Sequence, residues 1–213
     1  MRPKADGPLV RLAGWFGGHR LLALKLVAAS CLPVVFLTHH GWAENSTLDY
    51  FFDWIGYSLI ALGVAGRIWA SYHIAGRKNA ELVTEGPYSI CRNPLYLFAL
   101  LIVLGLLSLL ENAVIALPVI VVVSYAYHVA MRNEEKYLSS RHGERYAEYM
   151  GSVPRLFPAF WKYRRAEGRG SFDRRLFMRG VMDTGVFLLL IPVVEALEAM
   201  HVHNVLPVLI KVF

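Results

Sequence analysis

The stretch GPYSICRNPLY, residues 86–96, decides how the chain is organised because it is a polar, turn-forming segment between two apolar runs. One run covers residues 50–70, and the next begins at Leu95. Pro94 has no backbone donor, disfavours helical geometry at Asn93, and suits the first turn of a helix. The segment therefore predicts a loop that ends where a new helix starts, near Leu95.

The composition is too apolar for an ordinary soluble domain. Of the 213 residues, 56% are hydrophobic and 18% are charged, and the mean hydropathy is +0.42. A membrane-spanning helix needs about 20 apolar residues. Five stretches reach or approach that length, and they are Leu21–Leu37, Tyr50–Ala70, Leu95–Leu110, Val114–Met131 and Val181–Met200. We therefore predict an all-α integral membrane protein with about five transmembrane helices.

Two details complete this topology. The third and fourth runs are separated only by Glu111-Asn112, which predicts a helical hairpin. The first run is longer than the apolar part of a usual signal peptide and has no clear small-x-small cleavage site, so we interpret it as an uncleaved span. The two cysteines, Cys31 and Cys91, are too few for a disulfide framework, and we expect no metal site.

The basic residues predict the orientation. Of 22 Lys and Arg, four precede the first span, three lie between the second and third, and twelve lie between residues 132 and 179. By the positive-inside rule, the N-terminus, the loop around Pro87 and the long loop after Met131 are cytoplasmic, and the C-terminus is outside. We expect a plasma or inner membrane location. The net charge of +6 fits a basic face beside anionic lipid and requires no nucleic acid.

The polar segment has the chemistry of a binding site. The first-turn amides of the helix after Pro94 carry partial positive charge, and Arg92 adds a planar donor fork. Helical spacing places four residues of the fourth run within about 80° of one another: Tyr125, His128, Arg132 and Glu135. Glu134 points about 100° away from Glu135. The hairpin should bring these groups beside Arg92 and Asn93, although a purely structural pairing of Glu135 with Arg92 or Arg132 remains an alternative.

Two motifs then carry a family resemblance. The first comprises LVTEGPY at residues 82–88, RNPLY at residues 92–96, and Gly105. The second comprises Glu134-Glu135, Leu138, Gly143, Tyr146, Tyr149, VPR at residues 153–155, and Pro158. In order and spacing they resemble the signatures of the isoprenylcysteine carboxyl methyltransferase and phospholipid methyltransferase superfamily. The resemblance covers roughly residues 62–158.

The resemblance implies an enzyme that takes S-adenosylmethionine from the cytosol and methylates a lipophilic acceptor reaching the site from the bilayer. Arg92, Glu135 and Arg155 would be the catalytic residues. The cofactor would be bound by the hairpin and the cytoplasmic cap, through Gly86, Pro87, Tyr88, Arg92, Asn93, Pro94, Tyr96, His128, Arg132, Glu134, Glu135, Tyr146 and Tyr149. Asn93 stands where the family commonly has His, which is compatible with a positioning role but not with a titrating base.

This interpretation divides the chain into three parts. Residues 1–79 hold the N-terminal segment and the first two spans, residues 80–158 the methyltransferase core, and residues 159–213 a basic linker with the last span. The implied reaction is carboxyl O-methylation of the isoprenylcysteine type. Phospholipid N-methylation, a non-catalytic membrane interaction protein, and a reductase using a nicotinamide cofactor are the alternatives. The sequence identifies neither the acceptor nor the oligomeric state.

Overall fold

The computed structural model describes residues 38–40, 46–77, 81–166, 172–203, 205 and 210–212, so the expected first span at Leu21–Leu37 lies outside the described residues. The elements are β1 (Thr38–His40), α3 (Thr47–Ile74), α4 (Pro87–Ile90), α5 (Pro94–Leu110), α6 (Ala113–His142), α7 (Glu144–Ser152), η1 (Phe160–Lys162), α8 (Arg174–Leu188), α9 (Leu190–Val202) and β2 (Ile210–Val212). Among the described residues, β1 and β2 are the two strands; they pair in parallel, with Thr38 opposite Ile210. The all-α prediction is confirmed for this part of the chain.

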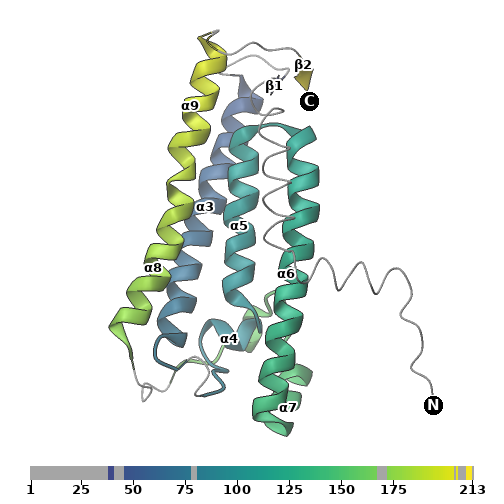
Figure 1. Ribbon diagram of the computed structural model, residues 1–213, viewed down its shortest axis with the longest axis vertical. Coiled ribbons are helices and arrows are strands. Elements are labelled where there is room, and N and C mark those ends of the chain that lie inside the picture. Colours follow the sequence, from purple (N-terminus) through teal and green to yellow (C-terminus); the bar gives the residue numbers. More distant parts are fainter. Residues whose placement is uncertain are drawn as a thin grey trace, which may run out of the picture.

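Long apolar helices form the bundle in Figure 1. Three are long and apolar enough to cross a membrane, at Thr47–Ile74, Ala113–His142 and Arg174–His201, and α5 is a shorter apolar helix of 17 residues. The last of the three combines α8 and α9, which meet at Leu189. Each expected span within the described residues is therefore a helix, while the total of five spans and the orientation stay predictions.

The α3–α5 pair forms the centre of the bundle. Its helices approach closely because glycines lie at the contact: a Cβ at Gly105 would lie 2.6 Å from the carbonyl oxygen of Gly56, and one at Gly63 would lie 2.7 Å from that of Phe98. Small residues allow this backbone approach between helices in a membrane. The pair fixes where α5 begins, and hence where the polar segment before it lies.

The hairpin between α5 and α6 turns where the sequence predicted. Glu111 adopts a left-handed conformation with φ of 49°, and Asn112 caps α6 by accepting a hydrogen bond of 3.2 Å from the amide of Ile115. With 30 residues, α6 is about 45 Å long. It therefore runs past the start of α5 and reaches α7 at the far end of the molecule (Figure 1).

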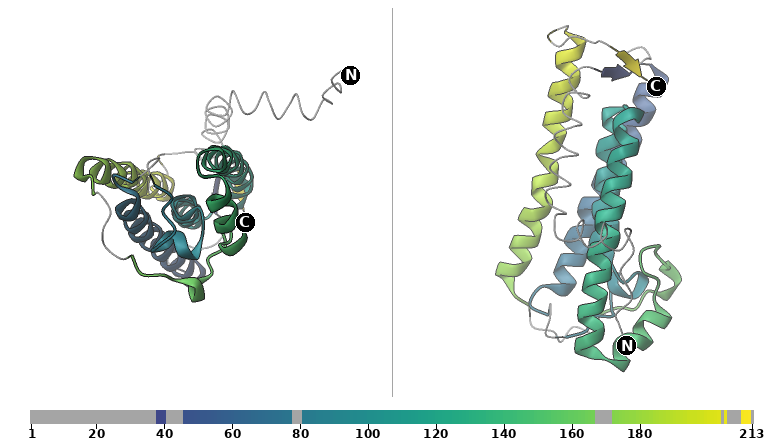
Figure 2. Two further views of the ribbon diagram at one scale, coloured as in Figure 1. Left: turned by 90° about the horizontal axis from the view of Figure 1, so that it is seen from below. Right: turned by 45° about the vertical axis from the view of Figure 1, so that its right-hand side comes forward.

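Helices α4 and α7 and the turn η1 gather at this end of the bundle and form a cap (Figure 2). The chain reverses between α6 and α7 at Gly143, whose φ of 54° suits glycine. Tyr146, Tyr149 and Val153 form a small buried core within the cap. In the view of Figure 1, the cap lies below the first turn of α5.

Candidate functional site

The polar segment of residues 86–93, which includes α4, is hydrogen-bonded to the rest of the cap and to residues next to it. Five hydrogen bonds join it to residues 149–164: Tyr149 Oη to Tyr88 O at 2.6 Å, Arg92 N to Pro154 O at 2.9 Å, Asn93 Nδ2 to Arg155 O at 3.1 Å, Ala159 N to Ile90 O at 2.9 Å, and Gly86 N to Arg164 O at 2.8 Å. The two motifs of the sequence thus form one structural unit.

Gly86 meets a steric requirement at the start of this unit. Its φ is 59°, and a Cβ there would lie 2.3 Å from Cδ2 of His73 on α3. Residues with a Cβ rarely adopt this backbone conformation, and His73 leaves no space for a Cβ here. The turn before α4 therefore needs glycine, and the segment packs directly on the end of α3.

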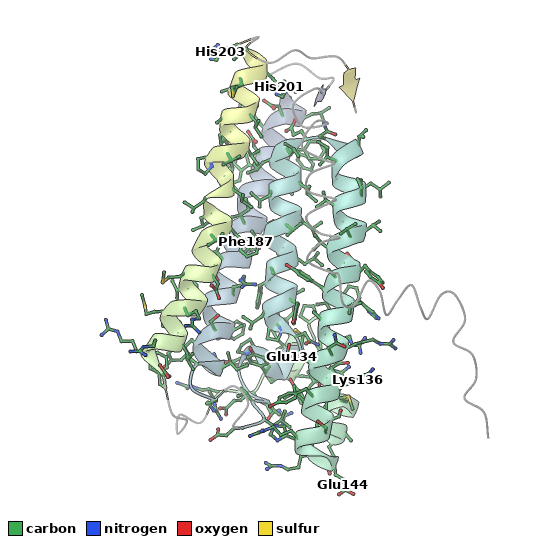
Figure 3. The ribbon with its side chains drawn as sticks, in the orientation of Figure 1. Glu134, Lys136, Glu144, Phe187, His201 and His203 are labelled. Atoms are coloured by element: carbon green, nitrogen blue, oxygen red, sulfur yellow. The ribbon has the colours of Figure 1, made fainter. Side chains whose placement is uncertain are left out.

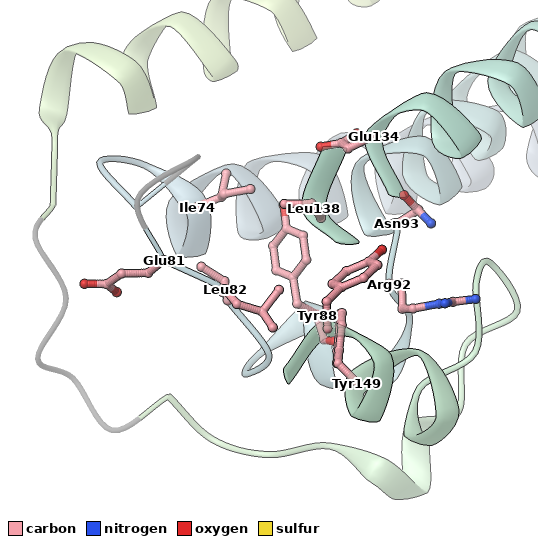
Figure 4. A pocket seen from close by; sticks show the side chains of 11 residues that line it. Ile74, Glu81, Leu82, Tyr88, Arg92, Asn93, Glu134, Leu138 and Tyr149 are labelled. Carbon is pink, nitrogen blue, oxygen red and sulfur yellow. The ribbon is translucent and has the colours of Figure 1, made fainter. Parts of the chain in front are cut away.

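A cavity of about 50 Å³ lies between the polar segment, the end of α6 and α7 (Figure 4). Six of the residues predicted from the sequence line it, and they are Tyr88, Arg92, Asn93, Glu134, Tyr146 and Tyr149. They come from α4, the loop before α5, α6 and α7. The structure thus brings together the polar residues of both motifs around one cavity.

Residues of opposite charge line this cavity. Arg92 lies at one side and Glu134 at the other, and Figure 3 shows Glu134 on the inner side of α6, whereas Lys136 lies on its outer side. Among the described residues, Glu134 takes part in no ion pair. Within the same part of the chain, two buried donors at the cavity, Arg92 Nε and Tyr88 Oη, have no hydrogen-bond partner. Unpaired buried donors are costly, and a polar ligand in the cavity would satisfy them.

Glu135 has a different environment from Glu134. Its carboxylate is buried and forms a bidentate ion pair with Arg155, in which Nε donates to Oε1 at 3.0 Å and Nη2 contacts Oε2. Arg92 Nη2 lies 3.7 Å from Oε1 of the same carboxylate. The structural alternative left open by the sequence, a pairing of Glu135 with Arg92, is therefore present. The motif included Arg155 but gave no sign that Glu135 is its partner.

The tyrosines of the site are held in their neutral form. Burial raises the pKa of Tyr88 well above its ordinary value, and the charge of Glu134 raises it further. Burial also raises the pKa of Tyr149, and it raises that of Tyr146 to about 12. At neutral pH these phenols therefore keep their protons and remain hydrogen-bond donors.

Other predicted residues lie outside the lining of the cavity. Pro87 and Pro94 are fully buried and shape the backbone, and Tyr96 stacks edge-on against Tyr127 of α6 with ring centroids 5.3 Å apart. The expected polar face of α6 is divided, because Glu135 is buried while His128 and Arg132 are exposed, as is Tyr125. His128 lies seven residues, about 10 Å, before Glu135 and so above the cap. Whether these residues touch a cofactor stays a prediction.

The apolar part of the cavity wall was not among the predicted site residues. Ile74 at the end of α3, Leu82 and Val83 after it, and Leu138 of α6 provide this wall. Leu138 follows Glu134 by four residues, so helical spacing alone places both on one face. Leu82 and Val83 also belong to the first motif, and their place in it was the sequence feature that could have indicated them as site residues. Among the described residues, no group of three or more His, Cys, Asp or Glu could hold a metal ion.

Comparisons with known proteins bear on the two motifs. The family model for phospholipid methyltransferases matches residues 51–145. Protein-S-isoprenylcysteine O-methyltransferase B of Arabidopsis thaliana is 32% identical over 154 residues, covering 66% of this chain and 74% of the relative. The chain belongs to the isoprenylcysteine carboxyl methyltransferase and phospholipid methyltransferase superfamily. With its apolar helices, this membership makes it an integral membrane protein of a methyltransferase family.

Two further relatives align along most of their length. The cobalt-zinc-cadmium resistance protein CzcN of Cupriavidus metallidurans is 32% identical over 188 residues, which are 88% of this chain and 86% of the relative. The nickel-cobalt-cadmium resistance protein NccN of Alcaligenes xylosoxydans xylosoxydans is 29% identical over 205 residues, or 93% and 91%. Their names describe resistance of those organisms rather than a chemical step. No solved structure matches the chain.

Asn93 remains the departure from the usual family pattern. Its side-chain amide donates to the carbonyl oxygen of Arg155 at 3.1 Å and does not cap α5. This bond ties the start of α5 to the residue that pairs with Glu135. The geometry fits a positioning role, which an amide performs without titrating.

Proposed function

We propose that this chain is an S-adenosylmethionine-dependent membrane methyltransferase that methylates a carboxyl group of a lipophilic acceptor. The observation that carries the proposal is that two residues of unlike charge, Arg92 and Glu134, line one cavity at the open end of the α5–α6 hairpin. The amino-acid end of the cofactor has one carboxylate and one ammonium group. Arg92 would hold the carboxylate through its donor fork, and Glu134 would hold the ammonium group.

The chain's own groups fit this cofactor. Arg92 Nε and Tyr88 Oη are buried donors at the cavity that lack a partner among the described residues, and a polar ligand would provide acceptors for them. The apolar wall with Leu82 and Leu138 suits an aromatic base. The space of about 50 Å³ is smaller than the cofactor, so binding would require the wall at Leu82 and Val83 to move outward.

The cofactor, when bound, supplies a methyl group already activated on a sulfonium. The remaining task of the protein is to align the acceptor with that group and to exclude water. Arg155 and Arg92 fix Glu135, and Tyr149 fixes Tyr88 through the 2.6 Å hydrogen bond. These bonds hold the cap against the hairpin and so keep Glu135 and Tyr88 in place.

The surroundings of Glu135 and His128 favour a carboxyl acceptor over an amine. A carboxylate attacks without losing a proton, whereas an ammonium headgroup must first be deprotonated. The carboxylate of Glu135 is ion-paired with Arg155. His128 is exposed above the cap and does not line the cavity. Glu135 and His128 are the groups on α6 that could take this proton, and neither is available, which supports O-methylation. Phospholipid N-methylation is the alternative suggested by the matched family model.

A thermal-shift measurement tests cofactor binding. Purified protein is heated with S-adenosylmethionine, with its demethylated product, and with NADPH, and we expect stabilisation by the first two alone. Glu134→Gln should weaken the shift because the ammonium group loses its partner. Glu148→Gln is the matched control, since Glu148 is exposed on α7 and does not line the cavity. Stabilisation by NADPH would favour a reductase, and stabilisation by none of these ligands a non-catalytic membrane protein.

A labelling experiment tests the acceptor. Membranes that contain the protein are incubated with cofactor carrying a labelled methyl group, and the labelled lipid fraction is treated with mild alkali. A methyl ester releases labelled methanol, as the proposal requires. A methylated amine keeps its label under the same treatment, and that result would replace O-methylation by N-methylation.

A further inference from the structure

An exposed aromatic segment crosses the outer side of the cap. Residues 157–165, FPAFWKYRR, form a stretch that we call the aromatic strap. Its large rings are unusually open, with Phe157 84% exposed, Phe160 68% and Trp161 82%. An exposed apolar patch of this kind marks a contact surface.

The strap lies level with the end of the membrane-spanning bundle. The ring of Tyr163 is 6.2 Å from that of Trp69 on α3, measured between centroids. Trp69 precedes the last residue of α3, Ile74, by five residues, or about 7.5 Å along the helix. Tyr and Trp gather at this depth, where their rings lie among lipid headgroups.

A second aromatic group marks the same end of α3. Tyr72 contacts Phe172 and Phe177 around the start of α8, with centroids 5.4 and 6.0 Å away. Tyr72 and Phe172 are themselves exposed. The strap and this second group therefore lie at the same end of α3.

The backbone of the strap is rigidly placed. Ala159 donates to the carbonyl oxygen of Ile90 at 2.9 Å, and the amide of Arg164 donates to Ser89 Oγ at 2.8 Å. The carbonyl of Arg164 also accepts from Gly86. The open rings thus belong to a fixed element whose backbone is bonded to the polar segment beside the cavity.

The charge of the strap indicates what kind of surface it contacts. Lys162, Arg164 and Arg165 are exposed, and residues 156–166 contain no Asp or Glu. Open rings beside basic groups, at the end of a membrane-spanning helix, match the headgroup layer of an anionic membrane. We propose that the aromatic strap inserts into the headgroup layer of the bilayer that the bundle spans, and so holds the cap against the membrane surface.

Tryptophan quenching in proteoliposomes tests this placement without any cofactor. Wild-type protein and Trp161→Phe are reconstituted into phosphatidylcholine vesicles with bromine near the headgroup end or at the tail end of the acyl chains. The difference between their emissions is the signal of Trp161. We expect stronger quenching of that signal by the shallow bromine. Trp54→Phe is the matched control, because Trp54 is 75% exposed but lies on α3 away from the strap.

Phosphatidylglycerol tests the contribution of the basic residues. Adding this anionic lipid should increase shallow quenching of Trp161, and the increase should disappear in Lys162→Gln/Arg165→Gln, which keeps the backbone bonds of Arg164. If the Trp161 signal is insensitive to both brominated lipids and open to acrylamide in the water phase, the proposal is wrong. The strap would then face the cytosol as a surface for another protein. Methyltransferase activity has no part in this readout, so the two proposals fail separately.

Discussion

The hydroxyl of Tyr149 on α7 donates a 2.6 Å hydrogen bond to the carbonyl oxygen of Tyr88 on α4, 61 residues earlier in the chain. Both residues are buried and line the same cavity. The bond therefore joins the two sequence motifs at the point where a ligand would meet them. Its loss should affect both the stability of the cap and the shape of the cavity.

Replacing Tyr149 by Phe removes this donor and leaves the carbonyl of Tyr88 buried without it. We expect a loss of about 1–3 kcal/mol in the free energy of unfolding. The measurement is thermal or denaturant unfolding of the purified protein in detergent. Tyr137→Phe is the control, because Tyr137 is 45% exposed on α6 and does not line the cavity. Equal stability of the two variants would mean that the bond does not hold the cap.

The ion pair of Glu135 with Arg155 should be coupled in a double-mutant cycle. Glu135→Gln and Arg155→Gln each break a charged, bidentate contact on a buried carboxylate, and each should cost about 1.5–3 kcal/mol. The double variant should cost much less than the sum, because the second substitution has no partner left to lose.

The partly exposed pair of Arg77 and Glu81 gives the control, measured with the second partner of Arg77, Glu85, left in place. Its atoms lie 2.9 Å apart, but the Glu81 side chain is 54% exposed. Solvent screens such a pair, so its coupling should be at most about 1 kcal/mol. If the Glu135–Arg155 cycle gives a coupling as small as this control, the buried pair is not what positions the end of α6.

Alkaline pH should destabilise the protein through its buried phenols. Burial raises the pKa of Tyr146 to about 12 and also raises those of Tyr88 and Tyr149. An unfolded tyrosine has a pKa of about 10. Above that pH the unfolded chain loses protons that the folded chain keeps, so the free energy of unfolding falls as pH rises, by up to about 1.4 kcal/mol per pH unit and per phenol. Below about pH 10 both states hold these protons, and the phenols contribute no slope.

Tyr146→Phe isolates one phenol in this measurement. Unfolding is followed between pH 8 and pH 12 for this variant and for wild type, and the variant should lose stability less steeply above about pH 10. Identical slopes would contradict the assignment of the pH dependence to Tyr146. Tyr137→Phe again serves as control, because Tyr137 is 45% exposed on α6 and does not line the cavity.

The sequence predicted the bundle well because its signals are local. Runs of apolar residues and the turn at Glu111-Asn112 predicted four of the described helical segments, and Pro94 predicted a helix start near Leu95, where α5 begins at Pro94. The candidate site was predicted through two motifs, and helical spacing predicted different directions for Glu134 and Glu135, which have different surroundings in the structure. The partner of Glu135 could not be predicted, because Arg155 reaches it only after the reversal at Gly143. The exposure of His128 and Arg132 also depends on where the cap ends, which helical spacing does not indicate.

The close contact of α3 with α5 gives the last prediction. In Gly105→Ala the added Cβ would lie 2.6 Å from the carbonyl oxygen of Gly56 and 2.7 Å from Cγ1 of Ile60. The helices must separate to accept it, which should cost about 1–3 kcal/mol in the free energy of unfolding.

Gly185→Ala on α8 is the matched control, because a Cβ there meets nothing within 4 Å. It should be neutral, or up to about 1 kcal/mol more stable from helix propensity. Because the same helix pair sets the position of α5, Gly105→Ala should also weaken the thermal shift with S-adenosylmethionine. A stable Gly105→Ala with unchanged ligand response would show that α3 and α5 tolerate a wider separation than the glycine contact implies.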